Sequence, residues 1–174
     1  MISQLFEILK SIGASVFPVA VIDAWQKGVV LRFGKPHRVL SPGFYFVIPF
    51  VEHVIRPSVV TTTTTLSAQT LLAPDGKLYT VEGVVRWSVS DVEAFAVKIW
   101  DGGNVVVDCC KGAIARALRE LGADEIDSRI LKYARAALDR YGIKVEAVTL
   151  TTIATVRVFR IISNQLPEPQ VAES

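Results

Sequence analysis

Few residues of this chain have the types and the spacing that catalysis requires. Acyl transfer needs a nucleophile beside a base, but the sequence has no Gly-x-Ser-x-Gly or equivalent motif. Phosphate chemistry favours a glycine-rich loop at a helix start, and residues 101–104 lack the lysine and the glycine spacing of such loops. An acidic cluster, Asp124, Glu125 and Asp127, lacks the regular ligand spacing of a calcium loop and better suits a helix start. We therefore predict that the protein is not an enzyme.

Candidate metal ligands and redox-active residues are also few. The two cysteines, Cys109 and Cys110, are adjacent, and vicinal cysteines rarely form a disulfide or bind zinc without other ligands. We interpret them as small buried residues. The two histidines, His37 and His53, have no Cys, Asp or Glu at ligand spacing. We expect no metal and no cofactor.

Basic residues are concentrated in one region of the chain. The formal net charge of +2 is too small to predict nucleic-acid binding through bulk electrostatics. Between residues 24 and 60, however, there are five basic residues and one acidic residue, Glu52. Such an excess suits an anionic membrane surface, and solvated strand edges are the alternative explanation. The basic residues are Lys27, Arg32, Lys35, Arg38 and Arg56, of which we assign the first four to membrane contact.

The N-terminal segment has one apolar side. Apolar residues recur three and four apart between residues 2 and 12, which predicts an amphipathic helix. Residues 13–22 are uncharged but fewer than the roughly 20 that a spanning helix needs, and Lys10 within the apolar stretch argues against a signal peptide. We expect a helix in the membrane plane or a shallow wedge, with docking on protein as the alternative. The predicted membrane-contact residues are Ile2, Leu5, Phe6, Leu9, Ile12 and Phe17.

Residues 28–50 carry the motif by which the chain resembles a known family. GVVLRFGK at residues 28–35, followed by PGF and IPF, resembles the opening signature of the stomatin, prohibitin and flotillin superfamily, also called SPFH or Band 7. DGKLYTVEGVVRWSV at residues 75–89 and YGIKV at residues 141–145 are similar to later blocks of that family. The resemblance implies a membrane scaffold that forms homo-oligomers and is not an enzyme. Many members continue into a long coiled coil, which we do not expect in this chain.

Period-two patterns predict that the middle of the chain is sheet. Strands are expected at residues 29–33, 44–48 and 61–65, the last because it is a run of β-branched threonines. The clearest strand is at residues 79–89, where Val81, Val85, Trp87 and Val89 share one face. A further strand begins at residue 143, and its uneven alternation predicts either a bulge or burial on both faces.

Helices are expected between these last two strands. Ser90 and Asp91 form an N-cap signal before a helix at residues 92–100, and further helices are predicted at 105–121 and 127–141, with Gly142 as the C-cap. On the second helix we expect a buried stripe of small residues, which consists of Val106, Cys109, Ala113, Ala117 and Leu121. The chain is 51% hydrophobic and 21% charged, which is typical of a globular protein.

The predicted fold is therefore α+β, an SPFH/Band 7-like domain with a mostly antiparallel sheet packed against two to three helices. It is divided into an apolar, amphipathic helical segment at 1–24, the SPFH/Band 7-like domain at 25–153, and a short helix with a disordered tail at 154–174. Our first functional hypothesis is a non-enzymatic scaffold on the cytoplasmic face of a membrane. Its partners would be membrane lipids, other copies of itself, and a membrane protease or other membrane protein, but not nucleic acid. The alternative is a soluble or particle-bound assembly subunit, for example phage-encoded, whose N-terminal helix docks on protein.

Overall fold

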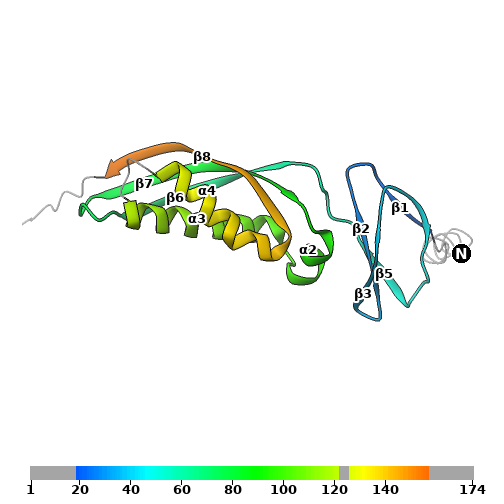
Figure 1. The fold of residues 1–174 in the computed structure, drawn as a ribbon. Coiled ribbons are helices and arrows are strands. Elements are labelled where there is room, and N and C mark those ends of the chain that lie inside the picture. The colour runs from blue at the N-terminus through cyan, green and yellow to red at the C-terminus, as the bar shows by residue number, and fades with distance from the viewer. Residues whose placement is uncertain (1–18, 122–125, 157–174) are drawn as a thin grey trace, which may run out of the picture.

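The computed structural model describes residues 19–121 and 126–156, which form two parts that follow one another along the molecule (Figure 1). The first, which we call the β part, contains five short strands. The second, the αβ part, contains three longer strands and three helices. The two parts meet where α2 contacts β2 and β3, and Val29 of the β part belongs to the core of the αβ part.

The β part consists of two small antiparallel sheets. β1 pairs with β4, and β2 lies between β3 and β5. Its own core is three buried residues, Ile22, Val30 and Leu40, against which Tyr45 and Val54 pack. The predicted strands at 29–33 and 44–48 are present with slightly shifted ends. The strands are β1 (Val19–Ile22), β2 (Gly28–Arg32), β3 (Lys35–Leu40), β4 (Gly43–Phe46) and β5 (Glu52–Ile55).

The first described strand corrects the prediction that residues 1–24 are helical. Val19–Ile22 is a strand in which Ala20 and Ile22 are buried and the two valines are exposed. The β-branched residues and the strict alternation favour a strand, and β4 supplies the pairing partner. The predicted amphipathic helix and its six membrane-contact residues lie outside the described residues.

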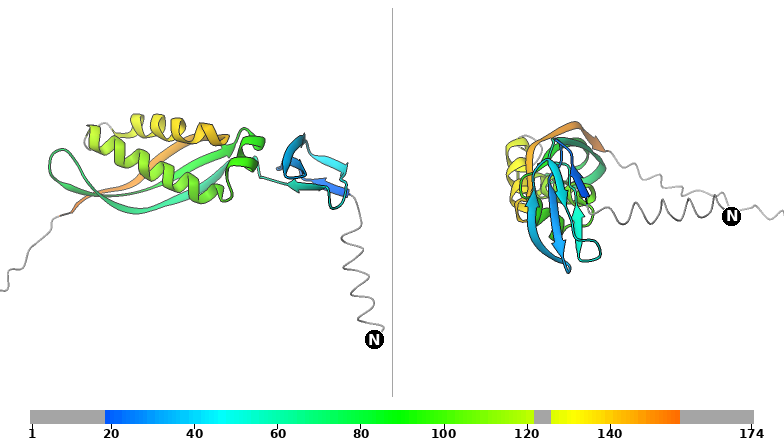
Figure 2. Two further views of the ribbon diagram at one scale, coloured as in Figure 1. Left: turned by 90° about the horizontal axis from the view of Figure 1, so that it is seen from below. Right: turned by 90° about the vertical axis from the view of Figure 1, so that its right-hand side faces the viewer.

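The αβ part is a three-stranded antiparallel sheet with helices on one face. The strand order is β6-β7-β8, and α3 and α4 lie side by side over the sheet (Figure 2). Its core contains residues from every one of these elements, among them Leu66, Val85, Leu118, Ile130 and Val145. The elements are β6 (Thr62–Leu72), β7 (Leu78–Val89), α2 (Val92–Lys98), α3 (Gly102–Leu121), α4 (Ile126–Leu138), the 3-10 turn η1 (Asp139–Tyr141) and β8 (Ile143–Val156).

The long strands confirm the predicted alternation. On β7, Val81, Val85 and Trp87 are buried, whereas Glu82 and Arg86 are exposed. The uneven pattern after residue 143 is explained by bulges, because the pairing of β8 with β7 shifts register twice. β8 continues to Val156, so residues 154–156 are strand and not the predicted short helix. The remainder of the predicted tail lies outside the described residues.

The helix ends follow the predicted capping residues. Oδ1 of Asp91 accepts hydrogen bonds from the backbone N–H groups of Glu93 and Ala94, each at 3.0 Å, and so caps α2. Gly142 ends η1 in the left-handed conformation with φ of 72°. A Cβ atom there would lie 2.2 Å from the carbonyl oxygen of Asp91, so a side chain is excluded as well as strained.

The buried stripe of α3 differs in part from the prediction. Val106, Ala113 and Ala117 are buried as expected, but the buried cysteine is Cys110, while Cys109 and Leu121 are half-buried. The larger residues Ile114 and Leu118 are also buried. The face of α3 that packs in the core therefore includes Cys110, which lies four residues before Ile114. Burial raises the pKa of the Cys110 thiol to about 12, which keeps it protonated and inert.

Candidate functional site

The β1–β4 ribbon has one face that nothing in the described residues covers. Val19 pairs with Phe46 and Val21 pairs with Phe44, so these four side chains share one side of the ribbon. The exposed fractions of Phe44 and Phe46 are 80% and 79%, and those of the two valines are 42% and 43%. We call this set the apolar ribbon face. Contiguous exposed apolar surface of this kind marks a contact with protein or membrane.

Two further phenylalanines are held outward by an unfavourable backbone. Phe33 and Phe50 have φ of 52° and 65°, and they are the non-glycine residues with positive φ among the described residues. Their exposed fractions are 78% and 100%. The N–H of Phe33 donates to the carbonyl of Val51 at 3.1 Å, so the two turns are adjacent. A left-handed conformation costs an ordinary residue about 1–2 kcal/mol, and such strain is typical of functional positions.

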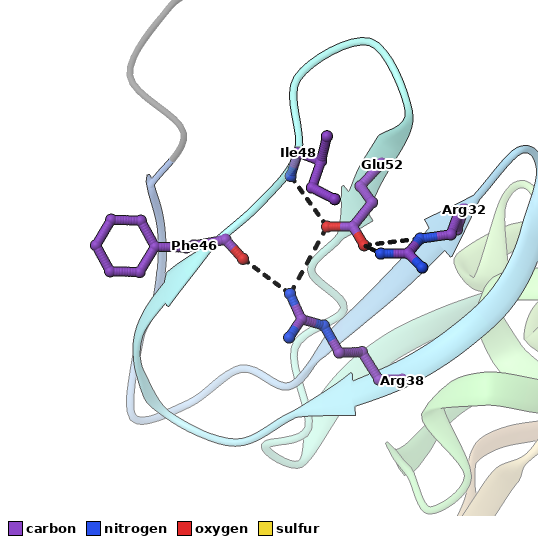
Figure 3. A network of polar contacts seen from close by, with 5 residues as sticks. All are labelled: Arg32, Arg38, Phe46, Ile48 and Glu52. Atoms are coloured by element: carbon purple, nitrogen blue, oxygen red, sulfur yellow. Dashed lines mark hydrogen bonds and ion pairs between the residues drawn. The ribbon is translucent and has the colours of Figure 1, made fainter.

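Behind the ribbon, one carboxylate organises two arginines and a loop (Figure 3). Nε and Nη2 of Arg32 both donate to Oε1 of Glu52, at 3.1 and 2.8 Å. Oε2 of Glu52 accepts from the N–H of Ile48 at 3.0 Å and lies 3.7 Å from Nη2 of Arg38. That same Nη2 donates to the carbonyl of Phe46 at 2.8 Å. The cluster therefore ties β2, β3 and β5 to the loop that follows β4.

The charge of this carboxylate is well stabilised. The side chain of Glu52 is only 1% exposed, whereas those of Arg32 and Arg38 are 39% and 43% exposed. The hydrogen bond from the Ile48 N–H lowers the pKa of Glu52, and the hydrogen bond and charge of Arg32 and the charge of Arg38 lower it further, against the effect of burial. Glu52 is therefore a carboxylate at neutral pH.

The structure places the four predicted basic contact residues in the β part. Lys27, Lys35 and Arg38 are exposed and Arg32 is half-buried. The charges of Arg32 and Arg38 are partly balanced by Glu52. The sequence shows Glu52 as the one acidic residue among five basic ones but not its contacts with the two arginines. Their contact with lipid stays a prediction.

Sequence reasoning missed the outward position of the exposed phenylalanines in the β part. The alternation at Phe44 and Phe46 predicts a strand, but it does not show that the face with the two phenylalanines is exposed to solvent. The pair Phe33-Gly34 is a sequence signal for this exposed turn. Both positions of the two-residue turn have positive φ, and phenylalanine is rare in that conformation. A residue that the turn disfavours is therefore a candidate for a role outside the fold.

Several other functions find no site in the described parts of the chain. Residues 19–121 and 126–156 contain no group of three or more His, Cys, Asp or Glu side chains arranged to hold a metal ion. Within the same residues, none of the helices has the length and apolar character needed to cross a membrane. The side chains of the acidic cluster, Asp124, Glu125 and Asp127, are not among those that the structure describes.

Comparison with known proteins identifies related chains. The family model of the SPFH domain / Band 7 family matches residues 20–166. An uncharacterised protein of Methanocaldococcus jannaschii is 23% identical over 159 residues, which cover 87% of this chain and 76% of that protein. Stomatin-4 of Caenorhabditis elegans is 21% identical over 162 residues, 88% of this chain and 58% of its own. HflC of Escherichia coli K12, a modulator of FtsH protease, is 28% identical over 112 residues, 60% of this chain and 32% of its own.

Proposed function

Because the chain belongs to the SPFH domain / Band 7 family, we propose that it is a non-enzymatic scaffold that associates with membranes and assembles with copies of itself. In this proposal the β part contacts the bilayer and the αβ part projects away from it. The basic residues favour the cytoplasmic face, where anionic lipids give the surface a negative potential. The chain spans about a third to three quarters of these three relatives, so their activities are not carried over as a whole.

The apolar ribbon face is the observation that carries this proposal. Aromatic and aliphatic side chains point outward there while the alternate residues Ala20 and Ile22 are buried on the other side. The ribbon begins within the apolar, amphipathic segment that the sequence predicts at residues 1–24. Exposed Lys27 and Lys35 lie in the same part of the molecule. A surface with aromatic residues and nearby lysines matches the interface between lipid headgroups and acyl chains.

The energetics of this contact favour assembly. Complete burial of a phenylalanine side chain contributes about 1.5–3 kcal/mol, and insertion at an interface contributes only part of that. A single copy would therefore bind a bilayer weakly. Several copies held together would bind much more tightly, because each later insertion is intramolecular. We propose homo-oligomerisation on this ground.

Vesicle flotation with the full chain tests the membrane contact. We expect the double variant Phe44→Ser/Phe46→Ser to lower recovery with phosphatidylcholine vesicles on the order of tenfold or more, because two outward aromatic rings are lost. The matched control is Trp100→Ser, which removes a wholly exposed aromatic side chain of the αβ part. This control should float as the unchanged protein does.

Three results would contradict the membrane contact. Equal recovery of the double variant and the unchanged protein would show that the ribbon face does not touch lipid. Loss of recovery with Trp100→Ser alone would place the contact on the αβ part. A defined multimer that forms without lipid and dissociates in the double variant would show that the face docks on protein, as the assembly-subunit hypothesis requires.

The match to HflC favours a second role beside the first. That relative is a modulator of FtsH protease, and the match covers 60% of this chain. We propose that this protein also associates with a membrane protease. Co-purification of a protease with the tagged full chain from detergent-solubilised membranes of its own host is the test. Recovery of the protein without any protease, under conditions that preserve its oligomer, would contradict this role.

A further inference from the structure

A hollow of about 440 Å³ opens beside the apolar ribbon face. It is lined by Arg32, His37, Arg38 and Glu52 and by the chain at residues 46–49. Two arginines, a histidine and one carboxylate therefore line a space that borders on Phe46, a member of the ribbon face.

The hollow carries an excess of positive charge. Two guanidinium groups face the single carboxylate of Glu52, which leaves one positive charge before His37 is considered. Glu52 is 1% exposed in its side chain and contacts the two arginines through different oxygens. It holds the guanidinium groups in place and exposes almost none of its own side chain. This arrangement orients two cations without neutralising both.

Both arginines keep donors for a ligand. Arg32 uses Nε and Nη2 on Glu52, and Arg38 uses Nη2 on Phe46 and Glu52. The Nη1 groups of both, and Nε of Arg38, make no hydrogen bond to any residue within 19–121 or 126–156. The two side chains are about two-fifths exposed, at 39% and 43%. A guanidinium is planar and presents N–H groups in a fork that fits phosphate oxygens.

We propose that this hollow binds a phosphate group, and that its source is the headgroup of an anionic phospholipid. In Figure 3 the ring of Phe46 points away from the cluster, while its carbonyl accepts the hydrogen bond from Arg38. This arrangement favours a lipid as the source. When the ring enters the bilayer surface, the guanidinium lies directly behind it, at the level of the headgroups. The inference rests on the proposed function, because a lipid source requires the β part to be at a bilayer.

Flotation of the full chain on two kinds of vesicle tests this inference. One kind contains phosphatidylcholine alone, and the other contains in addition a minority of phosphatidylglycerol. We expect the unchanged protein to bind the anionic vesicles about tenfold more tightly, as one charge-assisted contact allows. Arg38→Gln should remove most of this preference while binding to phosphatidylcholine persists. Arg38→Lys should abolish most of it as well, because an ammonium group lacks the planar fork.

The matched control is Arg56→Gln. Arg56 is an exposed arginine of the β part that does not line the hollow, and its loss changes the net charge by the same amount. This variant should keep most of the preference for anionic vesicles. Equal loss in Arg38→Gln and Arg56→Gln, or full preference in Arg38→Lys, would show that diffuse surface charge is responsible and would overturn the inference.

A soluble probe separates the two sources of phosphate. Glycerol 3-phosphate, titrated into the unchanged protein, should remove the preference for anionic vesicles only at concentrations far above those of the lipid. Tight binding of this probe without any vesicle preference would refute the lipid source. Binding to phosphatidylcholine with no preference would refute the inference and leave the proposed function standing. Failure to bind either kind of vesicle would refute the proposed function itself.

Discussion

The β part and the αβ part use their large apolar residues in opposite ways. The αβ part encloses a core to which β6, β7, β8 and all three helices contribute. The separate core cluster of the β part consists of Ile22, Val30 and Leu40, while Phe33, Phe44, Phe46 and Phe50 are 78% to 100% exposed. The comparison indicates that the αβ part supplies most of the stability and that the β part is shaped for contact with something else.

The largest effect that tests this comparison is expected in the αβ core. Leu118 is fully buried in α3, and Leu118→Ala should lower the free energy of unfolding by about 3 kcal/mol, through lost transfer energy and a cavity. Phe44→Ser in the β part should lower it by less than about 0.5 kcal/mol, because the ring is already exposed. Denaturant unfolding followed by circular dichroism measures both. A comparable loss for Phe44→Ser would mean that the ribbon face is packed in solution.

An intermediate effect of opposite sign is expected at Phe33. Phe33→Asn should raise the free energy of unfolding by about 1 kcal/mol, because asparagine before glycine suits the two-residue turn with positive φ. The same change should weaken binding to phosphatidylcholine vesicles, because an outward ring is lost. Thermal unfolding and flotation of one preparation measure the two properties.

The opposite signs at Phe33 are the decisive part of that experiment. A variant that is more stable and binds vesicles less would show that the turn sacrifices stability for contact. A variant that is less stable would contradict the comparison, because it would mean that the ring of Phe33 contributes to the fold of the β part.

The αβ part was more predictable than the β part, and the reason is physical. Long strands and helices repeat their burial pattern many times, so the buried face of β7 follows from residue spacing. The caps at Asp91 and Gly142 follow from the residue types at the ends of these repeats. The cysteine of the α3 stripe was misassigned because Cys109 and Cys110 both fit a helical period, and the packing of Ile114 and Leu118 decides between them.

In the β part the strands have four to six residues, too few for a period to show which face is buried. For that reason the sequence predicts part of a helical segment where β1 lies. The cluster around Glu52 joins Arg32 and Arg38, which are 20 and 14 positions away in the chain, and no local pattern reports such a contact. The basic residues were recognised from the sequence, but their organisation by one buried carboxylate required the fold.

The smallest effect is expected from acid, and it should differ between the two parts. Glu52 of the β part and Glu120 of α3 both have a lowered pKa, the first mainly through the Ile48 N–H and Arg32, the second through Arg116 and Tyr133. A carboxyl whose pKa is lower in the folded state stabilises fully above its unfolded value, here 4.5, and loses that contribution as the pH falls through the folded pKa. Both contributions should therefore be lost only below pH 4.5.

The backbone N–H of Ile48 gives a local readout of this loss, because it donates to Oε2 of Glu52 at 3.0 Å. Its NMR chemical shift should titrate with a midpoint below 4.5, and Glu52→Gln should remove the titration. Glu120→Gln is the matched control, since it removes a partly exposed carboxylate of the αβ part and should leave the Ile48 signal unchanged. A midpoint at or above 4.5 would show that the Glu52 cluster is not formed in solution, and with it the oriented pair of arginines would be lost. The buried residues of the αβ core carry no charge, so in that part the response to acid should come from the surface carboxylate of Glu120.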